Sequence, residues 1–197
     1  MILFDKLKEY DIILASQSPR RQYLLKETYI PFRVVLKDVP EDFNETASPG
    51  DIVLSLCRSK ANAYKNELSN SKTLLITADT IVYFNGRVIN KPGNEDETAN
   101  MLELLSGSVH DVYTGVCIKS LEKETAFFEK TSVEFEKLTS EEIWFYLENY
   151  KPFDKAGGYG IQDWIGLVAI KRIDGSYHNV VGLPASRFFK ELKNFIC

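Results

Sequence analysis

The sequence contains few residues of the kinds that build metal clusters or disulfide frameworks. Its 197 residues include two histidines, His110 and His178, and three cysteines. A zinc site that depends on several imidazole ligands is therefore not expected. Cys57, Cys117 and Cys197 are far apart and follow no metal-binding or redox spacing. We expect them to be the reduced thiols of a cytoplasmic protein.

The chain also lacks long apolar runs, internal repeats and an excess of positive charge. No stretch approaches the roughly 20 apolar residues of a membrane-spanning helix, and residues 1–14 carry charges every few positions, unlike a signal peptide. The net charge of −4 argues against a general nucleic-acid-binding protein. Neither the G-x-G-x-x-G dinucleotide pattern nor a G-x-x-x-x-G-K-[ST] phosphate loop is present. We therefore expect neither a nucleic-acid nor a membrane partner.

What is present is the composition of a globular protein, with 44% hydrophobic and 26% charged residues. No linker divides the chain, so we expect one domain that spans residues 1–197. Strands are expected at 11–15, 31–36, 73–84, 87–89, 109–120, 125–137, 167–173 and 177–181, and helices from Ser18, from Ser48 to about Leu68, and from Asn94, Thr139 and Pro184. Helices that interleave with both crossovers and hairpins predict an α/β protein with a mixed sheet.

Two adjacent arginines, Arg20 and Arg21, lie at the start of the helix that Ser18 and Pro19 open. Free N–H groups and the positive end of the helix dipole favour an anion there, and they disfavour cations that have no anion nearby. The segment from Ser16 to Arg21 therefore indicates a polyanionic ligand. An ordinary capped helix with solvated arginines is the alternative reading.

Asp79 interrupts an apolar strand, TLLITADTIVYF. A buried carboxylate without a partner would cost several kcal/mol. The side chain must therefore be paired, bound to a metal, or located at an exposed strand end.

Lys60 lies on the apolar side of the helix that follows Ser48, at helical spacing from Leu56, Cys57 and Tyr64. A lysine in such a stripe commonly extends along the helix to reach solvent. The alternative is that Lys60 delivers its ammonium group into a functional site.

Seven short motifs follow one another in the order and spacing of the Maf family, and together they cover almost the whole chain. The motifs are LASQSPRR (14–21), TADTIV (77–82), NKP (90–92), LSG (105–107), YTGV (113–116), DKAGGYGIQ (154–162) and GSYHNVVGLP (175–184). The sequence thus resembles the nucleoside triphosphate pyrophosphatases of this family. The resemblance implies a two-lobed α/β fold with an elongated mixed sheet and a deep central cleft.

The resemblance also implies roles for individual residues. Asp79 matches the proton acceptor of the family, and Arg20, Thr80 and Gln162 match its specificity positions. Ser16, Arg21, Lys60 and Lys91 match phosphate-binding positions, and Glu41 with Asp79 matches the positions that hold a divalent metal, Mg²⁺ or Mn²⁺. Glu41 lies in the acidic run from Asp38 to Asp42, so a neighbouring acid is an alternative match. The sequence does not decide whether Asp79 acts as a base or as a metal ligand.

The implied reaction is the hydrolysis of a nucleoside triphosphate to the monophosphate and pyrophosphate, in nucleotide-pool housekeeping in the cytoplasm. GIQ after AGGYG, together with the GSYHNVVGLP ending, resembles the branch that acts on dTTP and UTP, and the resemblance suggests a homodimer. Two other functions remain open. The protein could regulate septum formation by binding cell-division partners, or it could be a phosphatase that releases inorganic phosphate.

Overall fold

The structure is a computed structural model that describes residues 2–196, so Cys197 and the prediction of its reduced thiol lie outside the described residues. The chain divides into two compact units. Unit 1 comprises Met1–Asp79, Thr114–Glu129 and Gly182–Cys197, and unit 2 comprises Thr80–Tyr113 and Lys130–Val181. Each unit is described by itself below.

The strands form one mixed sheet, which confirms the predicted α/β class. They are β1 (Asp11–Leu14), β2 (Arg33–Val34), β3 (Thr73–Phe84), β4 (Arg87–Ile89), β5 (Val109–Lys119), β6 (Glu124–Phe135) and β7 (Ile170–Asp174). The order is β2-β1-β3-β5-β6-β7, and β4 pairs with β3. β1 is parallel to β2 and β3, whereas β4 and β7 are antiparallel to β3 and β6. The parallel pairs need crossover helices. β3 and β4 form a hairpin across Asn85-Gly86, whereas β6 and β7 are connected through α5 and α6.

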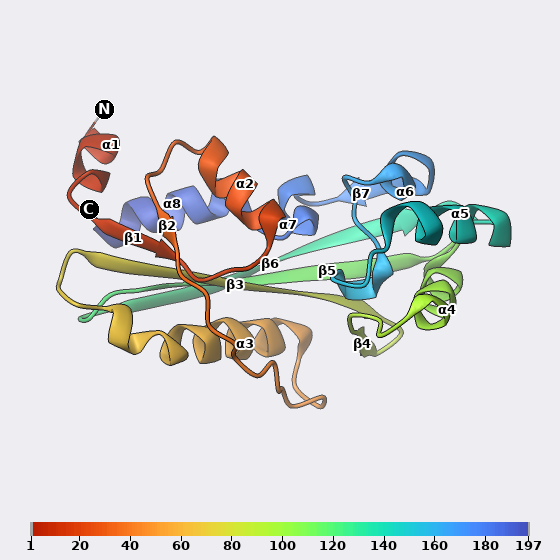
Figure 1. Cartoon of the computed structure of the whole chain (residues 1–197), viewed down its shortest axis with the longest axis horizontal. Coiled ribbons are helices and arrows are strands. Elements are labelled where there is room, and N and C mark those ends of the chain that lie inside the picture. Colours follow the sequence, from red (N-terminus) through yellow and green to blue (C-terminus); the bar gives the residue numbers. More distant parts are fainter. Residues whose placement is uncertain (1, 197) are drawn as a thin grey trace. The chain divides into compact units, whose positions relative to one another are not determined.

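In unit 1, helices cover both faces of the strands. These helices are α1 (Ile2–Leu7), α2 (Pro19–Glu27), α3 (Pro49–Ala63) and α8 (Ala185–Ile196). Figure 1 shows α3 on one face and α2 with α8 on the other. The predicted N-caps of α2 and α3 are confirmed, since the Ser18 and Ser48 side chains accept from the backbone N–H groups of Arg21 and Asp51.

A glycine allows α3 to approach β5 closely. A Cβ atom placed on Gly115 of β5 would lie 2.4 Å from the backbone oxygen of Val53 in α3, a distance that real Cβ atoms do not show. The apolar stripe of α3 then packs on the sheet, where Val53, Leu56 and Cys57 are at most 3% exposed. Position 115 therefore admits only a glycine at this spacing between helix and strand.

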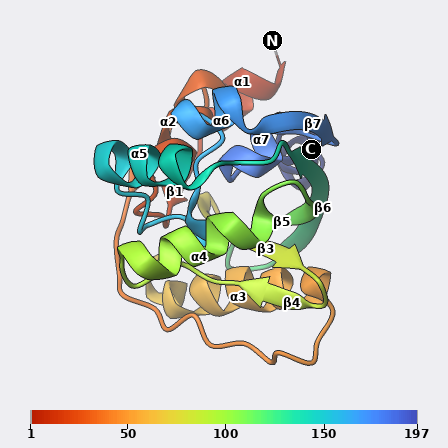
Figure 2. The same ribbon diagram turned by 90° about the vertical axis from the view of Figure 1, so that its right-hand side faces the viewer.

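In unit 2, α4 (Glu95–Leu105) packs against α5 (Ser140–Tyr150) and against the 3-10 turn η2 (Ala156–Gly158). The unit also contains the short helices α6 (Trp164–Val168) and α7 (Tyr177–Val181). Figure 2 shows the helices of this unit. Asn94 and Thr139 cap α4 and α5 as predicted, and Thr139 forms a full capping box with Glu142.

Four predictions of element bounds or type are wrong. The strand expected at 31–36 is only the two-residue β2, Arg33–Val34. The helix after Ser48 ends at Ala63, and a separate 3-10 turn, η1 (Lys65–Glu67), follows it instead of a continuous helix to Leu68. The strand expected at 167–173 is helical at its start, because α6 runs to Val168, and becomes β7 only at Ile170. The strand expected at 177–181 is the helix α7. No helix within residues 2–196 combines the length and apolar character that crossing a membrane requires.

Candidate active site

Asp79 is buried on β3, and its carboxylate is paired. The residue is 5% exposed, and its Oδ2 atom lies 2.5 Å from Nζ of Lys60. The same ammonium lies 2.7 Å from Oε1 of Glu41. Of the three possibilities that the sequence leaves for Asp79, the structure therefore shows pairing. It places one cation between two carboxylates.

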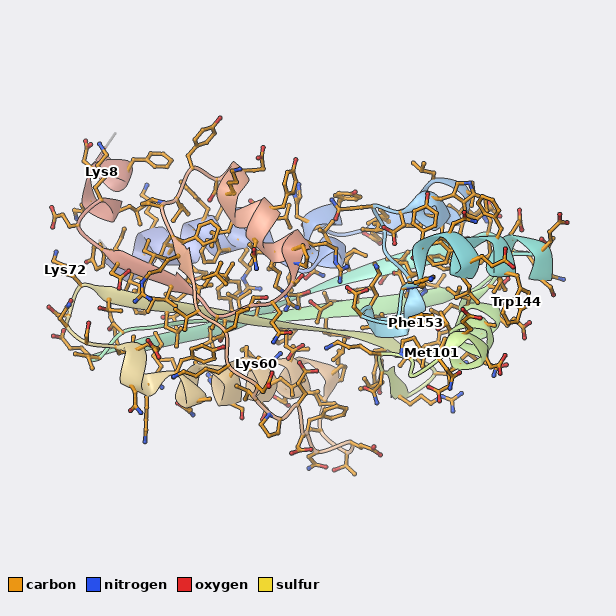
Figure 3. All side chains as sticks on the ribbon, in the orientation of Figure 1. Lys8, Lys60, Lys72, Met101, Trp144 and Phe153 are labelled. Carbon is orange, nitrogen blue, oxygen red and sulfur yellow. The ribbon has the colours of Figure 1, made fainter. Side chains whose placement is uncertain are left out.

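A hydrogen bond between α3 and β3 lies close to Lys60 and Asp79 in both elements. The Thr77 hydroxyl donates to the backbone oxygen of Cys57 over 2.6 Å, inside the core. Thr77 and Asp79 share a face of the strand, and Cys57 and Lys60 are three residues apart on the helix. This hydrogen bond therefore helps to align α3 with β3 so that the ammonium and the carboxylate meet. Lys60, labelled in Figure 3, is only 15% exposed and does not extend to solvent.

The turn before α2 holds Arg21 against the C-terminal part of unit 1. The Ser16 hydroxyl accepts from the backbone N–H of Ser18, and Nε of Arg21 donates to the backbone oxygen of Gly182 over 2.8 Å. Burial lowers the pKa of the Arg21 guanidinium, whereas the negative charge of Asp79 opposes that shift. Arg20 lowers the Arg21 pKa further and Glu41 raises it, so these side chains share one electrostatic environment.

The donor set of Asp79 and Glu41 suits a hard divalent cation. Two carboxylates that approach one ammonium can approach one metal ion, and Mg²⁺ is commonly held by one or two carboxylates together with substrate phosphates and water. Within residues 2–196, no group of three or more His, Cys, Asp or Glu side chains forms a complete metal site. Two carboxylates do not complete a metal site by themselves, so a cation held here would need further oxygen ligands.

In unit 2, the glycine-rich loop packs on the part of β3 that follows Asp79. The N–H of Gly157 donates to the backbone oxygen of Asn90, next to Lys91, over 3.1 Å. A Cβ atom on Gly157, which has a φ of +70°, would lie 2.9 Å from Val82. Val82 shares a strand face with Thr80. The segments that carry positions 80, 91 and 162 are distant in sequence, but the glycine-rich loop contacts both of the others within this unit.

Two buried polar contacts made by tyrosine hydroxyls in or next to this loop were not identified from the sequence. The Nε2 atom of His110 lies 2.8 Å from the Tyr159 hydroxyl, and burial lowers the pKa of His110 to about 4. The Tyr146 hydroxyl contacts the loop at Gly160. The sequence does contain a signal for Tyr146. It lies three residues after Ile143 and next to Leu147 in α5, which is the spacing of the buried face of this helix.

The structure thus groups the predicted site residues by unit. Ser16, Arg20, Arg21, Glu41, Lys60 and Asp79 lie in unit 1, and Thr80, Lys91 and Gln162 lie in unit 2. Direct contacts connect Glu41, Lys60 and Asp79, and electrostatic interactions connect these carboxylates with Arg21. Gln162 and Lys91 are exposed, and Thr80 is half-buried.

The chain matches a family model and full-length relatives. Residues 11–195 match the model described as "Maf-like protein". A dTTP/UTP pyrophosphatase of Parabacteroides distasonis is 47% identical over 98% of this chain and 100% of its own length. A protein of the same name from Bacillus cereus strain G9842 is 50% identical over 93% of this chain and 95% of its own. A solved HAM1 protein of Coxiella burnetii matches with a TM-score of 0.46 and 15% identity over 94% of this chain and 99% of that one.

Proposed function

Because the chain belongs to the family of Maf-like proteins, we propose that it is a nucleoside triphosphate pyrophosphatase that hydrolyses dTTP and UTP. The observation that carries this proposal is the buried Asp79 carboxylate, which Lys60 holds at 2.5 Å and which interacts with the Arg21 guanidinium. Relatives that share 47–50% of their residues with this chain over nearly its full length carry the same activity in their names. The protein is a hydrolase of acid anhydrides.

In the proposed reaction, water attacks the α-phosphorus. A bond forms from the water oxygen to that phosphorus, the bond from phosphorus to the α–β bridging oxygen breaks, and pyrophosphate leaves. Asp79 accepts the proton from the attacking water on its carboxylate. Lys60 fixes that carboxylate in place, which is the positioning that phosphoryl-transfer enzymes depend on.

The triphosphate brings about four negative charges, and cations must offset them. Arg21, Lys60 and Lys91 bind phosphate oxygens in this proposal, and the Ser16 hydroxyl donates to one. Asp79 and Glu41 would hold the Mg²⁺ or Mn²⁺ ion. A cation held by these two residues would neutralise charge on the phosphate oxygens.

Gln162, with Arg20 and Thr80, selects the base. The amide of Gln162 can accept from N3–H of uracil or thymine and donate to O4. Purines do not present these groups in the same place. The protein is proposed to act in the cytoplasm as a homodimer, without a nucleic-acid or membrane partner, and sedimentation analysis checks the oligomeric state.

A nucleotide panel tests the proposal. The protein is incubated with dTTP, UTP, CTP, ATP or GTP in the presence of Mg²⁺ or Mn²⁺, and products are resolved by chromatography. We expect the monophosphate and pyrophosphate as first products, with dTTP and UTP hydrolysed ahead of the purine nucleotides. Release of inorganic phosphate before pyrophosphate would identify a phosphatase instead.

Gln162→Ala is expected to flatten the base preference more than it slows hydrolysis of UTP. The reason is that a site which pairs polar groups of the base discriminates strongly, and the truncated side chain no longer pairs them. Values of kcat/KM for UTP, dTTP, CTP and GTP on wild type and variant measure the effect. An equal loss on all four nucleotides contradicts a role in selection. A wild type that prefers GTP contradicts the pyrimidine assignment but leaves the pyrophosphatase activity in place.

A further inference from the structure

Gln162 is the third residue of a tight turn. The N–H of Asp163 donates to the backbone oxygen of Gly160 over 3.0 Å, which closes a β-turn over residues 160–163. Within this turn Ile161 is buried at 6% exposure, whereas Gln162 is exposed. The turn therefore places the amide of Gln162 outward, and the direction of that amide follows from how the turn is held.

One phenol oxygen holds both ends of this turn. The Tyr146 hydroxyl accepts from the backbone N–H of Gly160 over 3.0 Å and donates to Oδ2 of Asp163 over 2.7 Å. Tyr146 is fully buried on α5, so the oxygen is fixed by a helix that lies outside the loop. A single side chain thus joins the first and last residues of the turn that carries Gln162.

The charge on Asp163 is paired on the same side. Nζ of Lys155 lies 3.7 Å from Oδ2 of Asp163 and 2.9 Å from Oδ1 of Asp154. The ammonium of Lys155 therefore pairs with two carboxylates of the loop region, Asp154 and Asp163. The glycine at position 160 is required by this arrangement, because a Cβ atom there would lie 2.5 Å from Oδ2 of Asp163.

We infer that Tyr146 is a positioning residue for base selection, because its hydroxyl fixes the turn that presents Gln162. This inference rests on the proposed function, in which Gln162 pairs with the base. An amide that rotates freely can present either its oxygen or its N–H₂ group, and so it accepts uracil and cytosine alike. A turn held at both ends limits the backbone freedom behind that amide. The hydroxyl of Tyr146 thereby sharpens the preference for UTP and dTTP over CTP.

The test compares two tyrosine-to-phenylalanine variants in the same helix. Tyr146→Phe removes the bridging hydroxyl and keeps the ring. Tyr150→Phe is the matched control, because the Tyr150 ring stacks on Tyr146 at 5.2 Å but the residue is 41% exposed. Asp163→Asn keeps an acceptor for the Tyr146 hydroxyl and removes the charge, so it separates the hydrogen bond from the ion pair.

The first readout is hydrogen exchange of the backbone amides at residues 160–163, in the absence of nucleotide. In Tyr146→Phe we expect exchange about tenfold faster, as for the loss of roughly one net hydrogen bond, and no change in Tyr150→Phe. The second readout is the ratio of kcat/KM for UTP to that for CTP, measured well below the unfolding temperature. It should fall about tenfold in Tyr146→Phe and stay within about twofold of wild type in Tyr150→Phe and Asp163→Asn.

Two results overturn the inference. One is a Tyr146→Phe variant that loses activity equally on UTP and CTP, which is what a merely structural role predicts. The other is an unchanged ratio in a variant whose turn exchanges faster. A wild type that does not hydrolyse pyrimidine triphosphates to pyrophosphate overturns the proposed function itself, and it is recognised from the wild type alone.

Discussion

Lys60 occupies a position in the stripe of α3 where its neighbours Cys57 and Ala61 are fully buried. The sequence pattern left two options for its ammonium group, solvent or a functional site. It did not decide between them, because helical spacing gives the face of a side chain and not the partner opposite. The partner is Asp79, and only the packing of α3 against β3 brings the two side chains together. Glu41 was similarly ambiguous within an acidic run that has no regular period, and the structure shows that it contacts Lys60.

Lys60→Ala is expected to lower the free energy of unfolding by about 3 kcal/mol, the lower end for breaking a buried ion pair, because Arg21 still interacts with Asp79. Mn²⁺ should recover part of this loss, since two carboxylates without their ammonium can share a divalent cation. Urea unfolding with and without MnCl₂ measures both effects. The control is Lys72→Ala, which removes a solvent-exposed pair with Glu9 and should leave the stability close to that of the wild type. Equal losses in the two variants would contradict the buried pairing.

Asp79→Asn should lower kcat for UTP by at least about 100-fold, the lower range for the removal of a general base. The amide is nearly isosteric and cannot accept the proton from water. Single-turnover and steady-state kinetics measure the loss, with circular dichroism as a check on folding. Asp11→Asn changes an exposed aspartate of β1 that is paired with Arg33, and it should leave kcat unchanged. Near-wild-type turnover in folded Asp79→Asn would refute the assignment.

At the scale of elements, the long strands and the capped helices were predictable, and the short helices α1, α6 and α7 were not. Residues 73–84 and 87–89 were predicted to the residue, because a long apolar run ends at an Asn-Gly turn. The segment Tyr177–Val181 has the composition of a strand, yet it forms α7. The Ser176 hydroxyl accepts from the N–H of Asn179, and the Asn179 amide donates to Val112 and Thr131 in the core. This local cap and the two tertiary hydrogen bonds of Asn179 override the strand propensity of tyrosine and valine.

The close approach of α3 to β5 predicts an unusual cost for a small substitution. Gly115→Ala should destabilise the protein by about 1–3 kcal/mol, since its Cβ atom would overlap the backbone of α3 at Val53 and force the helix away. Gly93→Ala is the control, because its Cβ atom would meet only the flexible Glu97 side chain, at 3.3 Å, and should change stability by less than about 0.5 kcal/mol. Chemical denaturation of both variants decides, and equal stabilities would contradict the packing argument.

At the scale of the whole molecule, β3, β5 and β6 each contribute residues to both units, and the chain passes from one unit to the other within each of these strands. Loss of pairing in one part of these shared strands should weaken the pairing of the remainder. We therefore expect the chain to unfold as one cooperative domain.

The chain carries separate reporters for the two units. Both tryptophans, Trp144 and Trp164, lie in unit 2, and the fully buried Cys57 and Cys117 lie in unit 1. Burial raises the pKa of each of these thiols to about 12, so both are poorly reactive until unit 1 opens. Tryptophan fluorescence and pulsed thiol alkylation in urea should give midpoints within about 0.3 M of each other. Clearly separated midpoints would show that the units unfold independently.

Asp79 and Thr80 are consecutive residues of β3, and consecutive side chains of a strand point to opposite faces. The proposed proton acceptor and one proposed specificity position therefore lie on opposite faces of one strand. Substitutions that arise at position 80 can be tolerated without repacking the carboxylate at position 79. In evolutionary terms, this alternation allows the preferred nucleotide to drift within a lineage while the chemistry of hydrolysis stays under constant selection.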